Sequence, residues 1–174
     1  MENKLLPLAC ALAGGLFTAD VCLADSVNIN VTGRITASPC VVSEERVSVD
    51  LGQTLQASSL ASSGAGSAMV PFQLRLINCP AGTTSVTARF SGQADPQSPQ
   101  RWKNIARSPA SNTAVEITER SSNTLVSNGS TLISFIASGS NSTQFNLQAR
   151  AYSALGSATP GDISSVITAT FEYQ

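Results

Sequence analysis

Two cysteines are the residues in this sequence whose type and spacing suggest covalent chemistry. The chain has four cysteines, of which Cys10 and Cys22 lie in an apolar N-terminal stretch typical of a secretory signal. The remaining pair is Cys40 and Cys79. An even pair in an exported chain predicts a disulfide, because the export compartment is oxidising. A metal site made of thiols is disfavoured, since the chain has no histidine and no CxxC spacing.

Catalysis is not expected from the remaining polar residues. Without histidine there can be no Ser-His-Asp or Cys-His site. The carboxylates are scattered, and the adjacent pair Glu44 and Glu45 would point to opposite faces of a strand. No glycine-rich phosphate loop leads from a strand into a helix. The sequence therefore predicts no enzyme, no cofactor, no metal and no small-molecule substrate.

The charge balance excludes further partners. Ten basic residues stand against eleven acidic ones, which gives no electrostatic reason to bind nucleic acid or an anionic membrane surface. One aromatic side chain, Trp102, is flanked by Arg101 and Lys103 in an irregular stretch and is a candidate contact for a sugar. An ordinary surface residue is the commoner interpretation of such a pattern.

The N-terminus is predicted to be removed on export. Residues 1–24 combine a basic Lys4, a mostly apolar run from Leu5 to Phe17, and a small-x-small cleavage pattern at Cys22-Leu23-Ala24. The mature chain would begin at Asp25, and its roughly 150 residues correspond to one domain of ordinary size.

Immediately after the predicted cleavage site, residues 25–37 show a strict period of two. Apolar residues alternate with polar ones at Val27, Ile29, Val31 and Ile35, with Gly33 in the same register. This pattern predicts a strand with an apolar ridge about 26 Å long. Alternation alone does not say whether the ridge is buried in this molecule or in another one.

Most of the remaining strand candidates also alternate with a period of two, while Leu132, Ile133, Phe135 and Ile136 form an apolar run. Strands are expected around 47–51, 70–76, 86–90, 115–120, 132–136 and 144–151, with a short one at Leu125. Pro71 indicates an edge position or a bulge, while 52–67 and 92–112 are expected to be loops. Seven or more short strands without a helical period predict a β-sandwich.

A last strand is expected from Gly161 to Gln174. Its inward face would consist of Ile163, Ile167, Ala169, Phe171 and Tyr173, with Ser165 as the one polar member. The apolar pattern continues to the penultimate residue, which indicates that this end is held in the structure rather than loose.

Several of these marks together resemble the pilins of the chaperone–usher class, most closely a minor, tip-region subunit of type 1 fimbriae. The marks are the alternating extension with Gly33, the cysteines Cys40 and Cys79, a glycine fourteenth from the end at Gly161, and a penultimate Tyr173. Each mark alone is weak, but at these spacings they are strong together and cover the whole mature chain. Ser165 departs from the apolar pattern of the family.

The resemblance implies an immunoglobulin-like, all-β sandwich that lacks its seventh strand. Residues 38–174 would be the pilin domain, and residues 25–37 a donor-strand extension with Val27, Ile29, Val31, Gly33 and Ile35 facing a neighbour's groove. The acceptor groove and chaperone contact of this chain would involve the following residues: Gly161, Ile163, Ile167, Phe171, Tyr173 and Gln174.

The partners implied by the resemblance are a periplasmic pilus chaperone, an outer-membrane usher and adjacent pilin subunits in a fimbria on the cell surface. The physical basis is β-augmentation, in which a foreign strand completes an open sheet edge. The alternative is a self-complete secreted β-sandwich, for example a carbohydrate-binding module, in which residues 25–37 are simply the first strand.

Overall fold

The computed structural model describes residues 30–34 and 38–174, which fall into two separate units. The predicted signal and the extension residues Val27, Ile29 and Ile35 lie outside the described residues. Residues 30–34 form no strand, and the Val31 side chain is 87% exposed. In the described part of the chain, no helix has the length and apolarity needed to cross a membrane.

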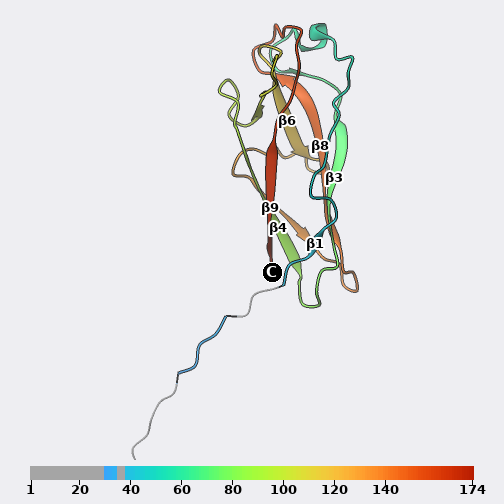
Figure 1. Ribbon diagram of the computed structural model, residues 1–174, viewed down its shortest axis with the longest axis vertical. Helices are drawn as coiled ribbons and strands as arrows, with labels where there is room; N and C mark the ends of the chain where they lie inside the picture. The colour runs from blue at the N-terminus through green and yellow to red at the C-terminus, as the bar shows by residue number, and fades with distance from the viewer. Residues whose placement is uncertain (1–29, 35–37) are drawn as a thin grey trace, which may run out of the picture. The chain divides into compact units, whose positions relative to one another are not determined.

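Residues 38–174 form two antiparallel sheets (Figure 1). The larger sheet has the strand order β1-β3-β8-β6-β5, and β2 pairs with β8 beside this path. Its strands are β1 (Val41–Val42), β2 (Ala65–Gly66), β3 (Val70–Ile77), β5 (Trp102–Lys103), β6 (Ala114–Glu119) and β8 (Thr143–Ser153). The helical structure among the described residues is one 3-10 turn, η1 (Ala57–Leu60).

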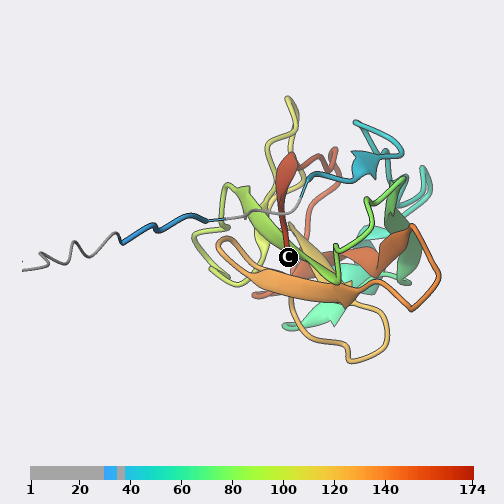
Figure 2. The ribbon, with the colours of Figure 1, turned by 90° about the horizontal axis from the view of Figure 1, so that it is seen from below.

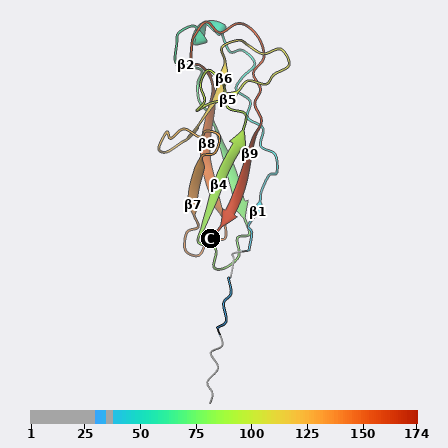
Figure 3. The ribbon, with the colours of Figure 1, turned by 90° about the vertical axis from the view of Figure 1, so that its left-hand side faces the viewer.

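The smaller sheet has the order β7-β4-β9, with β7 at Thr131–Phe135, β4 at Ser85–Gly92 and β9 at Ile167–Tyr173. Figure 3 shows β4 between the other two strands, with β9 running antiparallel to it. The C-terminus lies at the end of the sandwich that faces the viewer in Figure 2. β9 therefore forms one edge of its sheet.

The sequence pattern explains why these strands form a sandwich. Along β8, alternate residues such as Phe145, Leu147 and Ala149 are buried, while the residues between them are partly exposed. Leu76, Val86 and Phe90 from β3 and β4 pack into the same core. The period-two interpretation is confirmed for β3, β4 and β8, and the all-β fold with it. Strands are also present where β6 and β7 were predicted, but β6 is buried on both faces, and Ile133 and Phe135 of β7 are exposed.

The predicted disulfide is present. It joins Cys40 to Cys79, 39 residues apart, and both cysteines belong to the hydrophobic core. The bond ties the start of β1 to the end of β3, two strands that also pair at Val41–Ile77.

The edge of β3 that faces away from β8 is open beyond β1. Ser43 N donates to Arg75 O on this edge, at 2.9 Å. Because backbone groups alternate in direction along a strand, Gln73 and Pro71 face the same edge. The missing N–H of Pro71 is therefore turned outward, which confirms the predicted edge position of this proline.

The edge of β7 is capped at its last residue by a side chain from the start of β8. The Thr143 hydroxyl donates to the Phe135 carbonyl at 3.1 Å. In the other direction, the Ser134 hydroxyl of β7 donates to the Gln144 carbonyl of β8 at 3.1 Å. One outward backbone acceptor of β7 is therefore already used.

Trp102 is neither an ordinary surface residue, as expected, nor the alternative sugar contact. Its side chain is fully buried, and its indole Nε1 donates to Val126 O at 2.9 Å. The stretch 92–112, expected to be an irregular loop, contains the short strand β5, and Trp102 is its inward-facing residue. Arg101 instead pairs with buried Glu116, which also binds Arg150.

Three further expectations need smaller corrections. The stretch 52–67 contains η1 and β2 rather than loop alone. Leu125 makes one isolated bridge to Thr118 instead of a strand. The last strand begins at Ile167, not Gly161, because residues 161–166 bond to the 104–110 segment rather than to β4.

Candidate functional site

Residues 47–51 alternate as expected but do not pair as a strand. Val47, Val49 and Leu51 are half-buried, and the residues between them are exposed. After the bond from Ser43, residues 44–51 donate no backbone hydrogen bond within the described chain. The segment therefore turns its apolar side chains inward without a neighbouring strand on either side.

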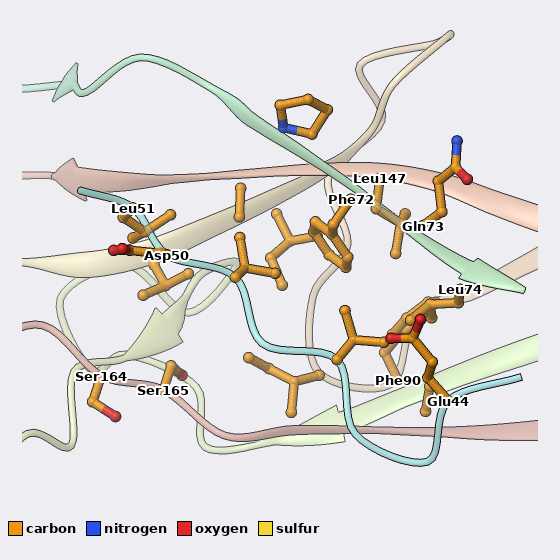
Figure 4. A pocket seen from close by; sticks show the side chains of 18 of the residues that line it. Glu44, Asp50, Leu51, Phe72, Gln73, Leu74, Phe90, Leu147, Ser164 and Ser165 are labelled. Atoms are coloured by element: carbon orange, nitrogen blue, oxygen red, sulfur yellow. The ribbon is translucent and has the colours of Figure 1, made fainter.

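A groove of about 1270 Å³ lies beside this segment (Figure 4). One wall is formed by residues 42–55 together with the exposed edge of β3, and the opposite wall by residues 161–165 and β9. Core residues of the two sheets lie beneath it: Phe90, Val115, Ile117, Leu147 and Ala149. The groove thus opens directly onto the core of the sandwich.

The walls of the groove are apolar but only half-buried. On β3 these residues are Phe72 and Leu74, and on the other wall they are Ile163, Ile167, Ala169 and Phe171. They pack against the buried core from its open side. Apolar side chains at this intermediate exposure would gain free energy from a cover, at about 25 cal/mol per Å² of apolar surface buried.

The backbone of β9 offers hydrogen bonds to the same groove. Ser85 and Gln174 exchange both of their backbone hydrogen bonds, at 3.1 and 3.0 Å. Since bonded and non-bonded pairs alternate in an antiparallel ladder, the pairs made by Tyr173, Phe171, Ala169 and Ile167 with β4 are non-bonded. Phe90 of β4, for example, is paired with Ala169, but its backbone hydrogen bonds are made on the β7 side: its N–H donates to Ser130 O, and its carbonyl accepts from Gly129 N.

It follows that Ile167, Ala169, Phe171 and Tyr173 direct their N–H and C=O groups away from β4, along the open edge of the sheet. Their side chains share the inward face. An extended segment lying in the groove could therefore pair with this backbone and place alternate side chains on the apolar floor.

The C-terminal end of β9 is fixed by several contacts. The Gln174 carbonyl oxygen accepts from Thr84 N and Ser85 N, at 2.6 and 3.1 Å. The Tyr173 hydroxyl lies 3.5 Å from the Cys40 carbonyl and donates to it. Burial raises the pKa of the Tyr173 phenol above its ordinary value of 10, so the donor stays protonated at neutral pH.

The other end of this wall is anchored by buried Asn104. Its amide nitrogen donates to Asp162 O at 2.8 Å, and its side-chain oxygen accepts from Ser164 N at 3.0 Å. Gly161 lies so close to the 109–110 backbone that a Cβ there would be 2.5 Å from Ala110 N. A side chain at position 161 would therefore push this wall of the groove away from the loop that holds it.

The structure brings most of the predicted acceptor residues together. Gly161, Ile163, Ile167 and Phe171 line the groove, as does Ser165. Tyr173 and Gln174 lie beyond its end and fix β9 to β4. Of the predicted extension residues, Val31 and Gly33 are described, and neither belongs to a strand.

Sequence reasoning did not identify the second wall. The sequence signal that could have identified this wall is the alternation of apolar residues in both of its segments. These residues are Val47, Val49, Leu51, Phe72 and Leu74. Each segment was predicted as a strand, and neither was linked to the groove that both of them line.

The sequence matches the family model described as "Fimbrial protein" over residues 29–174. Protein FimG of Escherichia coli strain K12 is 43% identical over 166 residues, covering 95% of this chain and 94% of that protein. The S-fimbrial adhesin protein SfaS of Escherichia coli O6:K15:H31 (strain 536 / UPEC) is 39% identical, covering 95% of this chain and 97% of that protein.

Solved structures show the same fold at lower sequence identity. The P pilus rod subunit PapA superposes with a TM-score of 0.65 at 20% identity, covering 79% of this chain and all of that one. A chaperone-usher pilus studied for rod uncoiling gives a TM-score of 0.63 at 20% identity, covering 90% of this chain and all of that one.

Proposed function

This chain belongs to the fimbrial protein family, and from that premise we propose that it is a tip-adaptor subunit that joins its neighbours by exchanging strands. The family is structural, so the chain is an exported subunit of a surface fimbria and not an enzyme. In the proposed role, the groove beside β9 receives the N-terminal extension of one neighbour. Residues 25–37 fill the corresponding groove of another.

One observation carries the proposal. One edge of β9 has no neighbouring strand, and this edge borders an open groove of about 1270 Å³. The residues that direct their backbone N–H and C=O groups to this edge are the same residues whose apolar side chains face the core. A complete sandwich would have a strand at this position. Both the hydrogen bonds and the apolar cover that are missing could be supplied by one extended segment.

The sequence of the extension supports the donor half of the proposal. Val27, Ile29, Val31 and Ile35 alternate with polar residues, as a strand that fills an apolar groove would. A self-complete sandwich, the rival proposal, would use this segment as its own first strand. Carbohydrate binding at Trp102 no longer supports that rival, because the indole is buried in the core.

Before assembly the groove needs a temporary occupant, and we propose that a periplasmic chaperone supplies it before delivery to an outer-membrane usher. The test is expression of the chain with and without a pilus chaperone, followed by gel analysis without boiling. A chaperone-bound subunit with little free monomer is expected. A stable free monomer in both cultures would remove the proposal in favour of the self-complete sandwich.

Deletion of Tyr173 and Gln174 is expected to abolish co-purification with the chaperone. The deletion removes the terminal backbone bonds to Thr84 and Ser85 and the phenol contact with Cys40 O. Each backbone bond contributes about 1 kcal/mol net, so β9 would fray where the chaperone must bind. Pull-down of a tagged chaperone measures the loss.

Gln174→Ala is the matched control, because it keeps the terminal backbone and its carboxylate while removing the side chain. This variant should bind the chaperone normally. Retention of the truncated chain by the chaperone would show that the end of β9 does not anchor the complex.

A further inference from the structure

Charge is distributed unequally around the groove. Between residues 151 and 174 the sequence has no lysine or arginine, and its charged side chains there are Asp162 and Glu172. Within residues 42–55, which form part of the opposite wall, Glu44, Glu45 and Asp50 stand against the single cation Arg46. All six of these side chains are exposed.

These carboxylates are not neutralised by ion pairs. Within the described chain, both salt bridges belong to Glu116, on the larger sheet. Asp50 accepts from two neutral donors, Gly52 N and Gln53 Nε2, at 2.9 and 3.3 Å. Two cations do line the groove, Arg75 and Arg120, but they face four carboxylates, namely Glu44, Glu45, Asp50 and Asp162. The groove lining is therefore net negative.

A strand lying in the groove would place its outward side chains among these carboxylates. Paired strands are about 4.8 Å apart, so its outward row would lie beside the exposed row Thr168, Thr170 and Glu172 on β9. On its other side it would meet the exposed residues of the 44–50 segment, which Figure 4 shows along the groove from Glu44 to Asp50. The exposed row of β9 would therefore lie within one Debye length of the occupant, about 8 Å at physiological salt.

From this charge distribution we propose that the groove selects its occupant by charge: it accepts an extension of a neighbouring fimbrial subunit whose outward row is neutral or cationic, and disfavours an acidic one. The inference rests on the proposed function and adds the chemistry of the partner. Opposite charges on neighbouring strands attract, and like charges destabilise the pairing. Apolar inward side chains would supply affinity, while the outward row would set the choice between extensions.

Residues 26–37 of this chain show what such an extension looks like. Their apolar row alternates with Ser26, Asn28, Asn30, Thr32 and Arg34, so that Arg34 is the one charge in the segment. A synthetic peptide of residues 26–37 is therefore a suitable probe. Its variants Arg34→Gln and Arg34→Glu change the outward charge and leave the apolar row intact.

The experiment refolds the secreted chain with each of the three peptides and measures the rate and extent of complex formation at low and high salt. The native peptide with Arg34 is expected to bind best, the Arg34→Gln peptide less well and the Arg34→Glu peptide least. The affinities of the first and last should differ by about threefold to tenfold at low ionic strength. This difference should shrink at about 0.5 M salt, where the Debye length falls to a few ångströms.

A double variant assigns the effect to the groove. Glu44→Gln together with Asp50→Asn should remove most of the preference while leaving the binding of the glutamine peptide unchanged. Lys103→Gln is the control, because Lys103 is exposed on β5 and does not line the groove. It should keep the preference.

The outcomes separate the two proposals. Equal binding of all three peptides would overturn selection by charge and leave strand exchange standing. Failure of all three peptides to bind, at any salt, would overturn the receptive groove itself and with it the proposed function.

Discussion

Replacing Phe171 with aspartate is expected to eliminate the folded subunit before assembly begins. Phe171 lies in the middle of β9, lines the groove and packs on Phe145, with ring centroids 6.0 Å apart. Removing a half-buried phenylalanine costs about 2 kcal/mol in packing. An unpaired carboxylate at the core adds several kcal/mol more. The free energy of unfolding of a natural domain is only about 5 to 15 kcal/mol in total.

Periplasmic yield and chaperone pull-down measure this effect, and both should fall to background. The neighbouring substitution Thr170→Asp is the control, because Thr170 is exposed on the outer face of β9, paired with Arg89. It should accumulate and bind normally. If Phe171→Asp accumulated as well as Thr170→Asp, the apolar face of β9 would not be part of the folding core.

Replacing Val31 with aspartate is expected to have the opposite pattern. The chain should reach the export compartment and bind its chaperone, since under the proposed function Val31 is not part of the core of its own subunit. It should then fail as a donor. Burying a valine side chain contributes about 1.5 to 3 kcal/mol, so its loss alone weakens donation about tenfold to a hundredfold. The buried carboxylate weakens it further.

Incorporation into surface fimbriae, scored against the chaperone-bound pool, separates the two steps. Thr32→Asp is the matched control, because it places the same carboxylate one residue along, on the outward row of the extension. That variant should still be incorporated, though less readily than the native chain. Unfolding of the chaperone-bound Val31→Asp subunit would instead place residues 25–37 in their own sandwich.

The strands were predictable from the sequence because alternation records which side chains face the core. β3, β4 and β8 each have one apolar and one polar row, and their predicted ranges agree with the structure within about two residues. The disulfide was predictable from cysteine number and compartment alone.

Residues 47–51 show the limit of this signal. Alternation identified the inward side chains correctly, but it predicted a strand where no partner is present. An apolar period of two indicates that one face of an extended segment is buried. It does not indicate whether the backbone of that segment is hydrogen-bonded to a neighbouring strand. For the same reason the groove could not be inferred from the pattern, only from the resemblance to pilins.

Other features could not be predicted because they depend on residues far apart in the chain. The Asn104 amide bonds to residues 58 and 60 positions later, and Glu116 joins Arg101 to Arg150 across three strands. Trp102 was misplaced because its charged neighbours suggested a surface loop. The alternation of Arg101, Trp102 and Lys103 also fits a short strand with one inward residue, which is what forms.

Pro71 and the hydroxyl of Thr143 have a consequence for the shape of the polymer. β3 offers no N–H at Pro71, and the β7 edge is occupied at Phe135 O. In the described chain, β1 and β5 are two residues long, whereas β9 directs the backbone groups of Ile167, Ala169, Phe171 and Tyr173 to an open edge. β9 is therefore the one edge to which the proposed function assigns the donor strand.

Under the proposed function, each subunit also has one extension, so its valence is two: it receives once and donates once. Monomers of valence two can form only unbranched chains or closed rings. A second receptive edge would make a third attachment possible, and a mixture of such subunits would form a network instead of a fibre. Pro71 and the Thr143 hydroxyl each remove one backbone group from a second edge, on β3 and on β7, and so favour a one-dimensional assembly.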